Sequence, residues 1–190
     1  MQAVGIPKDE NADRKYANFV KVGGRWEMRH RFYSVKASST HAPEGGNDYE
    51  ATNVRGYRDS AWAEGAAGDG IGESLTLTLD QPRKVSHIAI RNGLVKSGEN
   101  GGPDLYYANN RVAELGVSVN GGKPFTATVP DEFLFHPSYR IPLPLESPVV
   151  KTILLTIQKV HRGTKYRDTC ISGIELITPL SKKPKLEPVR

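Results

Sequence analysis

The sequence predicts an all-β protein, an antiparallel β-sandwich of about eight strands with a short N-terminal extension. From Arg31 onward, apolar and polar residues alternate with a period of two, which indicates strands with one buried and one solvated face. No segment between these strands is long and amphipathic enough for a crossover helix, which disfavours a parallel α/β sheet. The pair Asn120-Gly121 separates two alternating runs and favours a tight hairpin turn, because both central residues of such a turn need positive φ.

Eight segments carry the strand pattern. The clearest is 73–80, where Leu75, Leu77 and Leu79 alternate with serine and threonine. We expect the first and last strands to pair, and Gly173 to mark a bulge in the last one. The predicted strands are 31–39, 73–80, 85–92, 115–120, 125–129, 139–145, 153–160 and 171–177.

The chain divides into three predicted parts: an N-terminal extension (1–30), one sandwich domain (31–178) and a basic, proline-containing tail (179–190). A length of 190 residues fits one compact domain with additional ends. In the extension we predict a short helix, capped by Asp9 and ended by Gly23-Gly24. The apolar face of this helix would consist of Ala12, Tyr16, Phe19 and Val20.

The formal net charge of +5 comes from the C-terminal end of the chain. Residues 1–157 carry 18 Lys and Arg against 18 Asp and Glu, whereas residues 158–190 carry 8 against 3. Because the body is neutral and its aromatic residues do not interleave with basic ones, the sequence argues against nucleic-acid binding. We interpret the surplus as belonging to a solvated tail.

No apolar run approaches the roughly 18 to 20 residues that a membrane helix needs. The residues that follow Met1 also lack the apolar core of a secretory signal. We therefore predict no membrane span and no signal peptide in this chain, and the composition leaves the compartment open.

The residues that would support catalysis are missing from the sequence. The single cysteine, Cys170, excludes an internal disulfide and a multi-cysteine zinc cage, and the five histidines show no metal-ligand spacing. Glu64 and Glu73 are the only suggestive carboxylate pair, and they flank a glycine-rich loop. With neither a phosphate-binding loop nor a dinucleotide fingerprint, we predict a protein that is not an enzyme and has no organic cofactor.

Two long segments, 41–72 and 95–111, interrupt the strand pattern and are rich in Gly, Asn, Asp and Tyr. Loops of this length in a compact domain usually carry function. Several motifs in and after them follow one another in a fixed order: 53–65 (NVRGYRDSAWAEG), 68–73 (GDGIGE), Asn92-Gly93 with Lys96, Asn109-Asn110-Arg111, and 165–172 (KYRDTCIS).

This combination resembles the discoidin-like, galactose-binding-like β-sandwiches. In particular it is similar to the NADase-type glycan-binding domain, named for a module of a streptococcal NAD-glycohydrolase toxin. The resemblance covers about residues 31–177. It implies a jelly-roll sandwich that binds rather than reacts, as a bacterial glycan-recognising or surface-targeting accessory module. A secreted, periplasmic or cell-surface location goes with that reading.

The candidate ligand-binding residues combine flat aromatic rings with planar polar groups. Tyrosine rings stack on the apolar faces of sugars, and amide or guanidinium groups form paired hydrogen bonds with hydroxyls. An alternative stays open, in which this Asn-rich stretch bonds to its own backbone and Arg111 pairs with a carboxylate such as Glu64 or Glu73. The candidates are Asn92, Lys96, Tyr106, Tyr107, Asn109, Asn110 and Arg111.

Other residues of the motifs have predicted structural roles. Trp62 is expected to close the core below the loops, and Glu64, Glu73 and Asp168 to hold the loops in place. The resemblance implies a structural Ca²⁺ with Asp59 and Glu175 as its ligands. In this chain Arg55 and Gly173 stand where relatives often have Asp and Glu, which removes hard oxygen ligands and leaves Ca²⁺ binding an open question.

Two functions remain after this reading. The first is a non-catalytic module that binds a glycan or glycoconjugate through the loops of 41–72 and 95–111. The second is a protein-protein interaction module, such as an adaptor, accessory or effector-neutralising domain, that uses the same loop rim.

Overall fold

The computed structural model describes residues 17–56, 60–96, 103–134, 139–144 and 148–182. Strands make up most of this part of the chain, with one short α-helix and one 3-10 helix. The elements in chain order are β1 (Ala17–Val22), β2 (Arg25–His30), β3 (Tyr33–Ala37), η1 (Ala51–Arg55), β4 (Trp62–Ala63), β5 (Ser74–Lys84), β6 (His87–Asn92), α2 (Pro103–Ala108), β7 (Asn110–Val119), β8 (Phe125–Thr128), β9 (Tyr139–Pro142), β10 (Val149–His161) and β11 (Thr169–Leu180).

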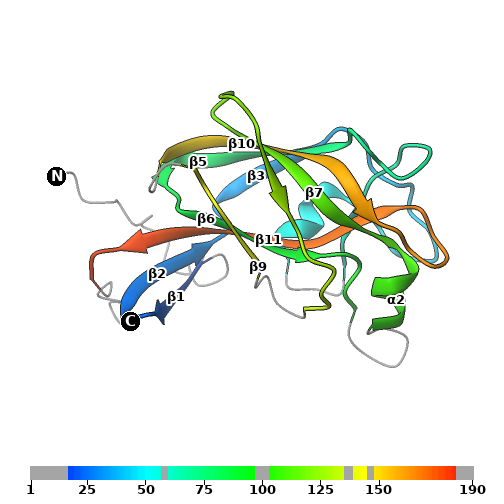
Figure 1. The fold of residues 1–190 in the computed structure, drawn as a ribbon, viewed down its shortest axis with the longest axis horizontal. Helices are drawn as coiled ribbons and strands as arrows, with labels where there is room; N and C mark the ends of the chain where they lie inside the picture. The colour runs from blue at the N-terminus through cyan, green and yellow to red at the C-terminus, as the bar shows by residue number, and fades with distance from the viewer. Residues whose placement is uncertain (1–16, 57–59, 97–102, 135–138, 145–147, 183–190) are drawn as a thin grey trace.

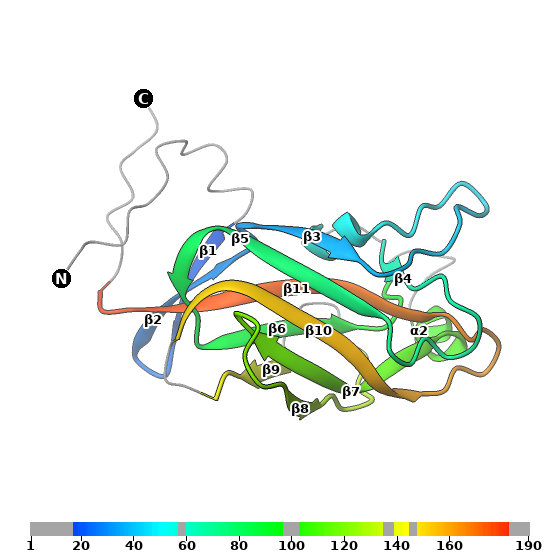
Figure 2. The same ribbon diagram turned by 90° about the horizontal axis from the view of Figure 1, so that it is seen from above.

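The strands form two layers of a curled sheet (Figures 1 and 2). One layer has the order β3-β5-β10-β7-β8, and the other has β1-β2-β11-β6-β9. The long neighbours pair antiparallel, and the layers meet where Asn110 of β7 pairs in parallel with Thr169 of β11. The predicted antiparallel sandwich is confirmed, and each of the eight predicted strands has a counterpart in the structure, which also contains β1, β2 and β4.

The core lies between the layers because the alternation of the sequence points one face of each strand inward. Leu75, Leu77 and Leu79 of β5 are buried, and they belong to the same cluster as Ile153 and Leu155 of β10. The facing layer adds residues of β6 and β11 to this cluster, which buries the apolar surface of both sheets. These residues are Ile88, Ile90, Ile174 and Leu176.

The turn predicted at Asn120-Gly121 is confirmed. Asn120 has φ 51° and Gly121 has φ 72°, and the turn joins β7 to β8 as antiparallel neighbours. The Asn120 side chain also accepts backbone hydrogen bonds from Lys151 and Thr152 of β10, which anchors the hairpin to the sheet.

The N-terminal segment differs from the prediction. Residues 17–22 form strand β1 rather than the end of a helix, and Asp9 lies outside the described residues. Gly23 (φ 55°) and Gly24 (φ 82°) make a tight turn into β2, which pairs with β1 along its whole length. Since β2 also pairs with β11, the edge of the sheet supplies backbone hydrogen bonds that hold this segment as a hairpin.

Two details of strand pairing also differ. The first predicted strand contains β3, which pairs with β5 and not with β11. Its link to the last strand is a side chain, because Tyr33 donates its hydroxyl proton to the carbonyl oxygen of Ile174 (2.8 Å). Gly173 pairs with Arg91 in a regular register and marks no bulge there. β11 ends at Leu180, inside the predicted tail, and residues 183–190 lie outside the described part.

Candidate functional site

A pocket of about 290 Å³ lies at the end of the sandwich that carries α2. Four loop segments and the ends of β4 and β11 meet there, so residues distant in the sequence face one another. Its base is apolar and its walls are polar or aromatic. The lining residues are His41, Glu44, Gly45, Asn47, Tyr49, Ala63, Leu94, Lys96, Leu105, Asn109, Tyr166, Asp168 and Cys170.

The base of the pocket is a small hydrophobic cluster separate from the main core. It consists of Ala61, Ala63, Leu94 and Cys170, with Tyr49 and Leu105 packed against it. The Cys170 thiol is buried, and burial raises its pKa far above the ordinary value. The thiol therefore stays protonated and is no nucleophile at neutral pH.

The walls present planar polar groups and tyrosine rings. Lys96 donates a hydrogen bond from Nζ to Oδ1 of Asn47 (2.8 Å), and no carboxylate among the described residues lies within ion-pair distance of its ammonium group. Tyr166 is 40% exposed, and the ammonium of Lys165 lies 4.7 Å from the centre of its ring. Tyr49 also lines the pocket and is half-buried.

His41 and Asp168 face each other within this pocket. Nε2 of His41 lies 3.8 Å from Oδ1 of Asp168, and the side chains are 30% and 37% exposed. Nδ1 of His41 lies 2.7 Å from the carbonyl oxygen of Ala42. The imidazole ring also meets Tyr49 edge-on, with the ring centres 5.2 Å apart.

A second, smaller pocket of about 140 Å³ shares several lining residues with the first. Asn47, Tyr49, Leu94 and Lys96 belong to both, so the Lys96–Asn47 pair stands at their junction. The two pockets together form an extended depression at this end of the molecule.

The wall that carries Tyr166 and Asp168 is fixed by Asn110 at the start of β7. Asn110 is buried, donates from Nδ2 to the carbonyl oxygen of Arg167 (2.7 Å) and accepts the amide of Gly163 (2.7 Å) at Oδ1. A Cβ at Gly163 would lie 2.4 Å from the carbonyl oxygen of Ala108, so only glycine fits this approach of the 161–168 loop to α2.

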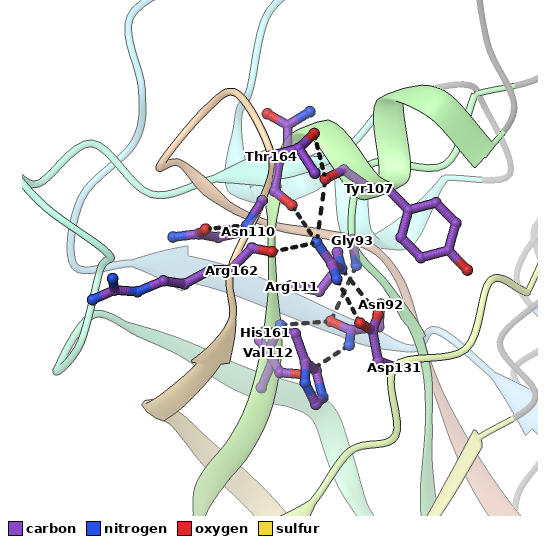
Figure 3. Close-up of polar contacts among 12 residues, drawn as sticks. Asn92, Gly93, Tyr107, Asn110, Arg111, Val112, Asp131, His161, Arg162 and Thr164 are labelled. Carbon is purple, nitrogen blue, oxygen red and sulfur yellow. Dashed lines mark hydrogen bonds and ion pairs between the residues drawn. The ribbon is translucent and has the colours of Figure 1, made fainter.

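Arg111 ties together the end of α2 and two neighbouring loops (Figure 3). Its Nε and Nη2 donate to the two carboxylate oxygens of Asp131, and its Nη1 donates to the carbonyl oxygens of Asn109 (2.9 Å) and Arg162 (3.2 Å). Burial alone would raise the pKa of Asp131, but the hydrogen bonds from Arg111 hold it below the ordinary value. Arg111 therefore pairs with Asp131, and neither Glu64 nor Glu73 is its partner.

Asn92 joins the two layers of the sandwich just below (Figure 3). At the end of β6, its Nδ2 donates to the carbonyl oxygen of Val112 (2.8 Å), and its Oδ1 accepts the amide of Val112 (3.0 Å). The side chain thus supplies a backbone-like pair of hydrogen bonds between strands that belong to different layers.

The sequence-predicted ligand residues separate into two groups. Lys96 and Asn109 line the pocket, and Asn109 is itself buried and donates from Nδ2 to the carbonyl oxygen of Leu105 (2.8 Å). Asn92, Asn110 and Arg111 are buried, bond within the protein and do not line the pocket. Tyr106 is fully buried under Gly93 and packs edge-on against the rings of Tyr107 and Phe133; Tyr107 is 42% exposed outside the pocket. We carry only Lys96 and Asn109 forward as proposed ligand contacts.

The lining residues that were not singled out from the sequence include His41, Asn47, Tyr49 and Tyr166. Three of them fall in the long segment 41–72, and Tyr166 falls in the motif 165–172. A tyrosine inside a polar, glycine-rich loop was the available signal, because such a ring has few apolar neighbours in sequence to bury it.

Of the residues with predicted structural roles, Trp62 and Glu64 are buried, Glu73 is half-buried, and Asp168 is half-buried in the pocket wall. Trp62 is buried in the main cluster and donates from Nε1 to the carbonyl oxygen of Ser39 (3.0 Å). Glu64 accepts the amides of Ala66 (2.8 Å) and Thr169 (3.2 Å), and its burial raises its pKa. Glu73 accepts hydroxyl hydrogen bonds from Ser38 and Ser39, which lower its pKa.

A family model for the NAD glycohydrolase translocation F5/8 type C domain matches residues 27–177. The chain belongs to this family. F5/8 type C domains are discoidin-like, so the resemblance predicted from the motifs is confirmed. Among curated proteins, none matches the chain.

The fold of this F5/8 type C domain is similar to that of several solved carbohydrate-binding modules. The family 32 module of Clostridium perfringens NanJ, solved with galactose, has 20% identity and a TM-score of 0.51, with 76% of this chain and 93% of that chain covered. The C. perfringens module CpGH89CBM32-5, in complex with GalNAc-β-1,3-galactose, has 15% identity and a TM-score of 0.50, with coverages of 76% and 94%. A chitosan-binding module from Paenibacillus sp. IK-5 has the same identity, coverages and TM-score.

The calcium site that the resemblance implies falls partly outside the described residues. Asp59 lies outside the described part, and Glu175 is buried on β11. Nη1 of Arg31 donates to the carbonyl oxygen of Arg55 (2.8 Å), so a guanidinium group already uses a loop carbonyl. In the part of the chain that is described, no three His, Cys, Asp or Glu side chains come together as a metal site requires.

None of the described helices has the length and apolar character needed to cross a membrane.

Proposed function

We propose that this F5/8 type C domain is a non-catalytic module that binds a glycan in the pocket beside α2. The observation that carries the proposal is the pocket itself, in which Tyr49 and Tyr166 flank polar side chains over an apolar base. Sites for small molecules commonly combine an apolar concave base with a few oriented polar groups.

The chemistry of the walls suits an uncharged polyhydroxylated ligand. A tyrosine ring offers a flat apolar face to the C–H groups of a pyranose. The amides of Asn47 and Asn109 provide both donors and acceptors, the Lys96 ammonium donates, and the Asp168 carboxylate accepts. Such a set discriminates between hydroxyl orientations, because each sugar hydroxyl both donates and accepts.

The ligands of the similar modules support this assignment as an analogy of fold. Those modules bind galactose, a GalNAc-containing disaccharide and chitosan, respectively. We propose the same ligand class, a glycan or glycoconjugate, for this chain. A location outside the cytoplasm or at the cell surface follows as part of the proposal, because glycans of this kind are displayed there.

We propose that the module has no catalytic activity of its own. The pair Glu64 and Glu73 that suggested hydrolysis is engaged in hydrogen bonds with neighbouring backbone amides and serine hydroxyls. The Cys170 thiol is kept protonated by burial. A glycosidase needs two carboxyl groups placed on either side of a bond, and these two glutamates hold loops instead.

A protein-binding function is the second candidate, and one observation favours it. Three large apolar or aromatic side chains are exposed at this same end: Ile71 and Tyr166 on loops, and Tyr107 on α2. Apolar residues on a loop rim can anchor another protein. The experiment below therefore includes an outcome that assigns the rim to a protein partner.

A glycan array followed by calorimetry tests the proposed function. We expect binding in the range of roughly micromolar to millimolar, because hydroxyls exchange water for protein hydrogen bonds at little net gain. Tyr166→Ala should weaken binding at least about tenfold through loss of stacking, while the matched control Tyr107→Ala, exposed outside the pocket, should not.

The opposite result is equally specific. If the wild type binds nothing across broad glycan libraries, and a pull-down returns one stoichiometric protein that sugars do not displace, the protein-interaction function replaces this proposal.

A further inference from the structure

We infer that His41 and Asp168 together hold two neighbouring hydroxyl groups of the sugar, and that mild acid releases the ligand by joining these two side chains directly. This inference rests on the proposed function, since it names the part of the glycan that the pocket recognises and the condition that controls it.

The hydrogen-bond partner of Nδ1 fixes the tautomer of His41. Nδ1 lies 2.7 Å from the carbonyl oxygen of Ala42, and a carbonyl oxygen only accepts hydrogen bonds. Nδ1 therefore carries the proton. In the neutral ring the other nitrogen, Nε2, has a lone pair and accepts a hydrogen bond.

Nε2 of His41 faces the carboxylate of Asp168. Oδ1 of Asp168 lies 3.8 Å from Nε2, and both side chains line the pocket and are partly exposed. With the ring neutral, two acceptors face each other and have no proton to share. A group that fills this position must bring two donors, one for each acceptor.

The two acceptors select which group of the ligand can fill this position. One hydroxyl has a single proton and satisfies one acceptor, whereas two adjacent hydroxyls of a sugar satisfy both. A water molecule has two protons and would hold the position until the sugar displaces it. An ammonium group would also satisfy both acceptors, and an amino-sugar glycoside in the experiment below tests for it.

The other titratable groups around His41 do not take the place of Asp168 as the group that faces Nε2. Tyr49 meets the imidazole edge-on, and burial raises the pKa of its phenol, which stays neutral. Glu44, on the same loop, is exposed, and Lys96 is bonded to Asn47. Tyr166 and the buried thiol of Cys170 complete the surroundings. Asp168 is the carboxylate that lies within 4 Å of the ring.

Acidification reverses the role of Nε2. Histidine side chains take up a proton between about pH 8 and pH 5. The protonated ring then donates from Nε2 to Asp168, and a charge-assisted hydrogen bond between them competes with the two hydroxyls. The pocket would thus bind its glycan at neutral or alkaline pH and release it in mildly acidic surroundings.

Calorimetry at pH 8 and pH 5 tests this with methyl glycosides of galactose, N-acetylgalactosamine, glucose and mannose. We expect the strongest binder to lose at least about tenfold in affinity at pH 5, since a charge-assisted hydrogen bond to the ligand is lost. Its monodeoxy analogues at the recognised diol should be weaker at pH 8 by a similar factor. His41→Gln should flatten the pH dependence, and the control His161→Gln should preserve it.

Nitrogen-detected NMR of the unliganded protein provides an independent readout. In the neutral ring of His41 it should place the proton on Nδ1, which faces the carbonyl oxygen of Ala42, and a proton on Nε2 would overturn the inference.

The outcomes separate this inference from the proposed function. If sugars bind equally well at both pH values, or bind without regard to the diol, the inference fails and the proposed function stands. If an amino-sugar glycoside binds more tightly than its hydroxyl parent, an ammonium site replaces the diol. If no glycoside binds the wild type at either pH, both fail together.

Discussion

Asn110 donates a hydrogen bond from Nδ2 to the carboxylate of Asp69 (3.2 Å), and the two residues are separated by 41 positions in the sequence. The same carboxylate accepts Nε of Arg167 (2.9 Å), and this hydrogen bond is the main cause of the lowered pKa of Asp69. Together they clamp the 161–168 loop against the 64–73 loop. Tyr166 and Asp168, two walls of the pocket, are carried by that clamped segment.

Removing the clamp should therefore affect both stability and binding. Asn110→Ala deletes three side-chain hydrogen bonds in a buried position and should lower the free energy of unfolding by about 2–3 kcal/mol, measured by urea denaturation. It should also weaken glycan binding without any contact to the ligand. Arg162→Ala, whose side chain is 78% exposed, is the matched control and should leave both nearly unchanged. Equal effects of the two variants would contradict this role for Asn110.

Gly93 is expected to be intolerant of a side chain. Its φ is 71°, and a Cβ there would lie 2.6 Å from the Tyr106 ring and 2.7 Å from Arg111. Gly93→Ala should cost at least about 2 kcal/mol of unfolding free energy, from backbone strain plus overpacking. Gly121→Ala has nearly the same φ but open space around the new methyl group, so it should cost only about 1 kcal/mol. A thermal unfolding series with both variants checks the difference, and a similar loss for both would mean that the contact with Tyr106 is unimportant.

The fold was largely predictable because its signals are local. Alternation along β5 and β10, and the turn chemistry of Asn120-Gly121, depend only on residues that are neighbours in sequence. Gly23-Gly24 was ambiguous, since two glycines suit both a helix end and a hairpin turn. The choice depended on the edge of β11, which pairs with β2 and lies about 150 residues away in the chain.

The candidate site was less predictable because the partners of polar residues are distant in sequence. Asn110 and Arg111 have the donors that a sugar site needs, but their acceptors are Asp69, 41 residues earlier, and Asp131, 20 residues later. The sequence gives the type of each side chain, but not which group that side chain contacts in the fold. The long segment 41–72 contributes several lining residues of the pocket, yet the approach of His41 to Asp168 exists only in the fold.

The stability of the domain should fall in acid because of His30. This residue is buried at the end of β2, its Nε2 bonds to Thr178 Oγ1 (3.0 Å), and its Nδ1 has no hydrogen-bond partner among the described residues. Burial, and then the positive charge of Arg83, lower its pKa from 6.5 to about 3. The folded-state pKa lies below the unfolded one, so the unfolded chain binds the proton first.

His30 therefore stabilises the folded state at neutral pH and loses this effect in acid. The stabilisation is fully present above about pH 6.5 and is lost progressively as the pH falls toward about 3. Urea unfolding at pH 7, 5 and 4 should show a loss on the order of a few kcal/mol in the wild type. His30→Gln should be less stable at pH 7 but should show a flatter pH dependence; an unchanged slope would assign the acid sensitivity to other groups.

Removal of divalent metal should leave the fold intact. The Arg31 guanidinium already bonds to the Arg55 carbonyl oxygen, and the loop lacks the carboxylate that Arg55 replaces. We expect the melting temperature in EDTA to match that in excess CaCl₂ within about 1 °C, because a ligand that binds the folded state would raise it. A melting temperature that drops in EDTA and recovers with Ca²⁺ would restore the calcium site with Asp59 and Glu175 as ligands.

The central claim is that the glycan binds in the pocket beside α2, and amide chemical-shift mapping with a bound sugar tests it most directly. The account predicts that the largest shifts cluster at Tyr49, Lys96, Asn109 and Tyr166, while Tyr107 and the outer face of β5 and β10 stay unchanged. Shifts concentrated on that outer sheet face, or on the β1–β2 hairpin at the opposite end, would place the binding site elsewhere and contradict the account.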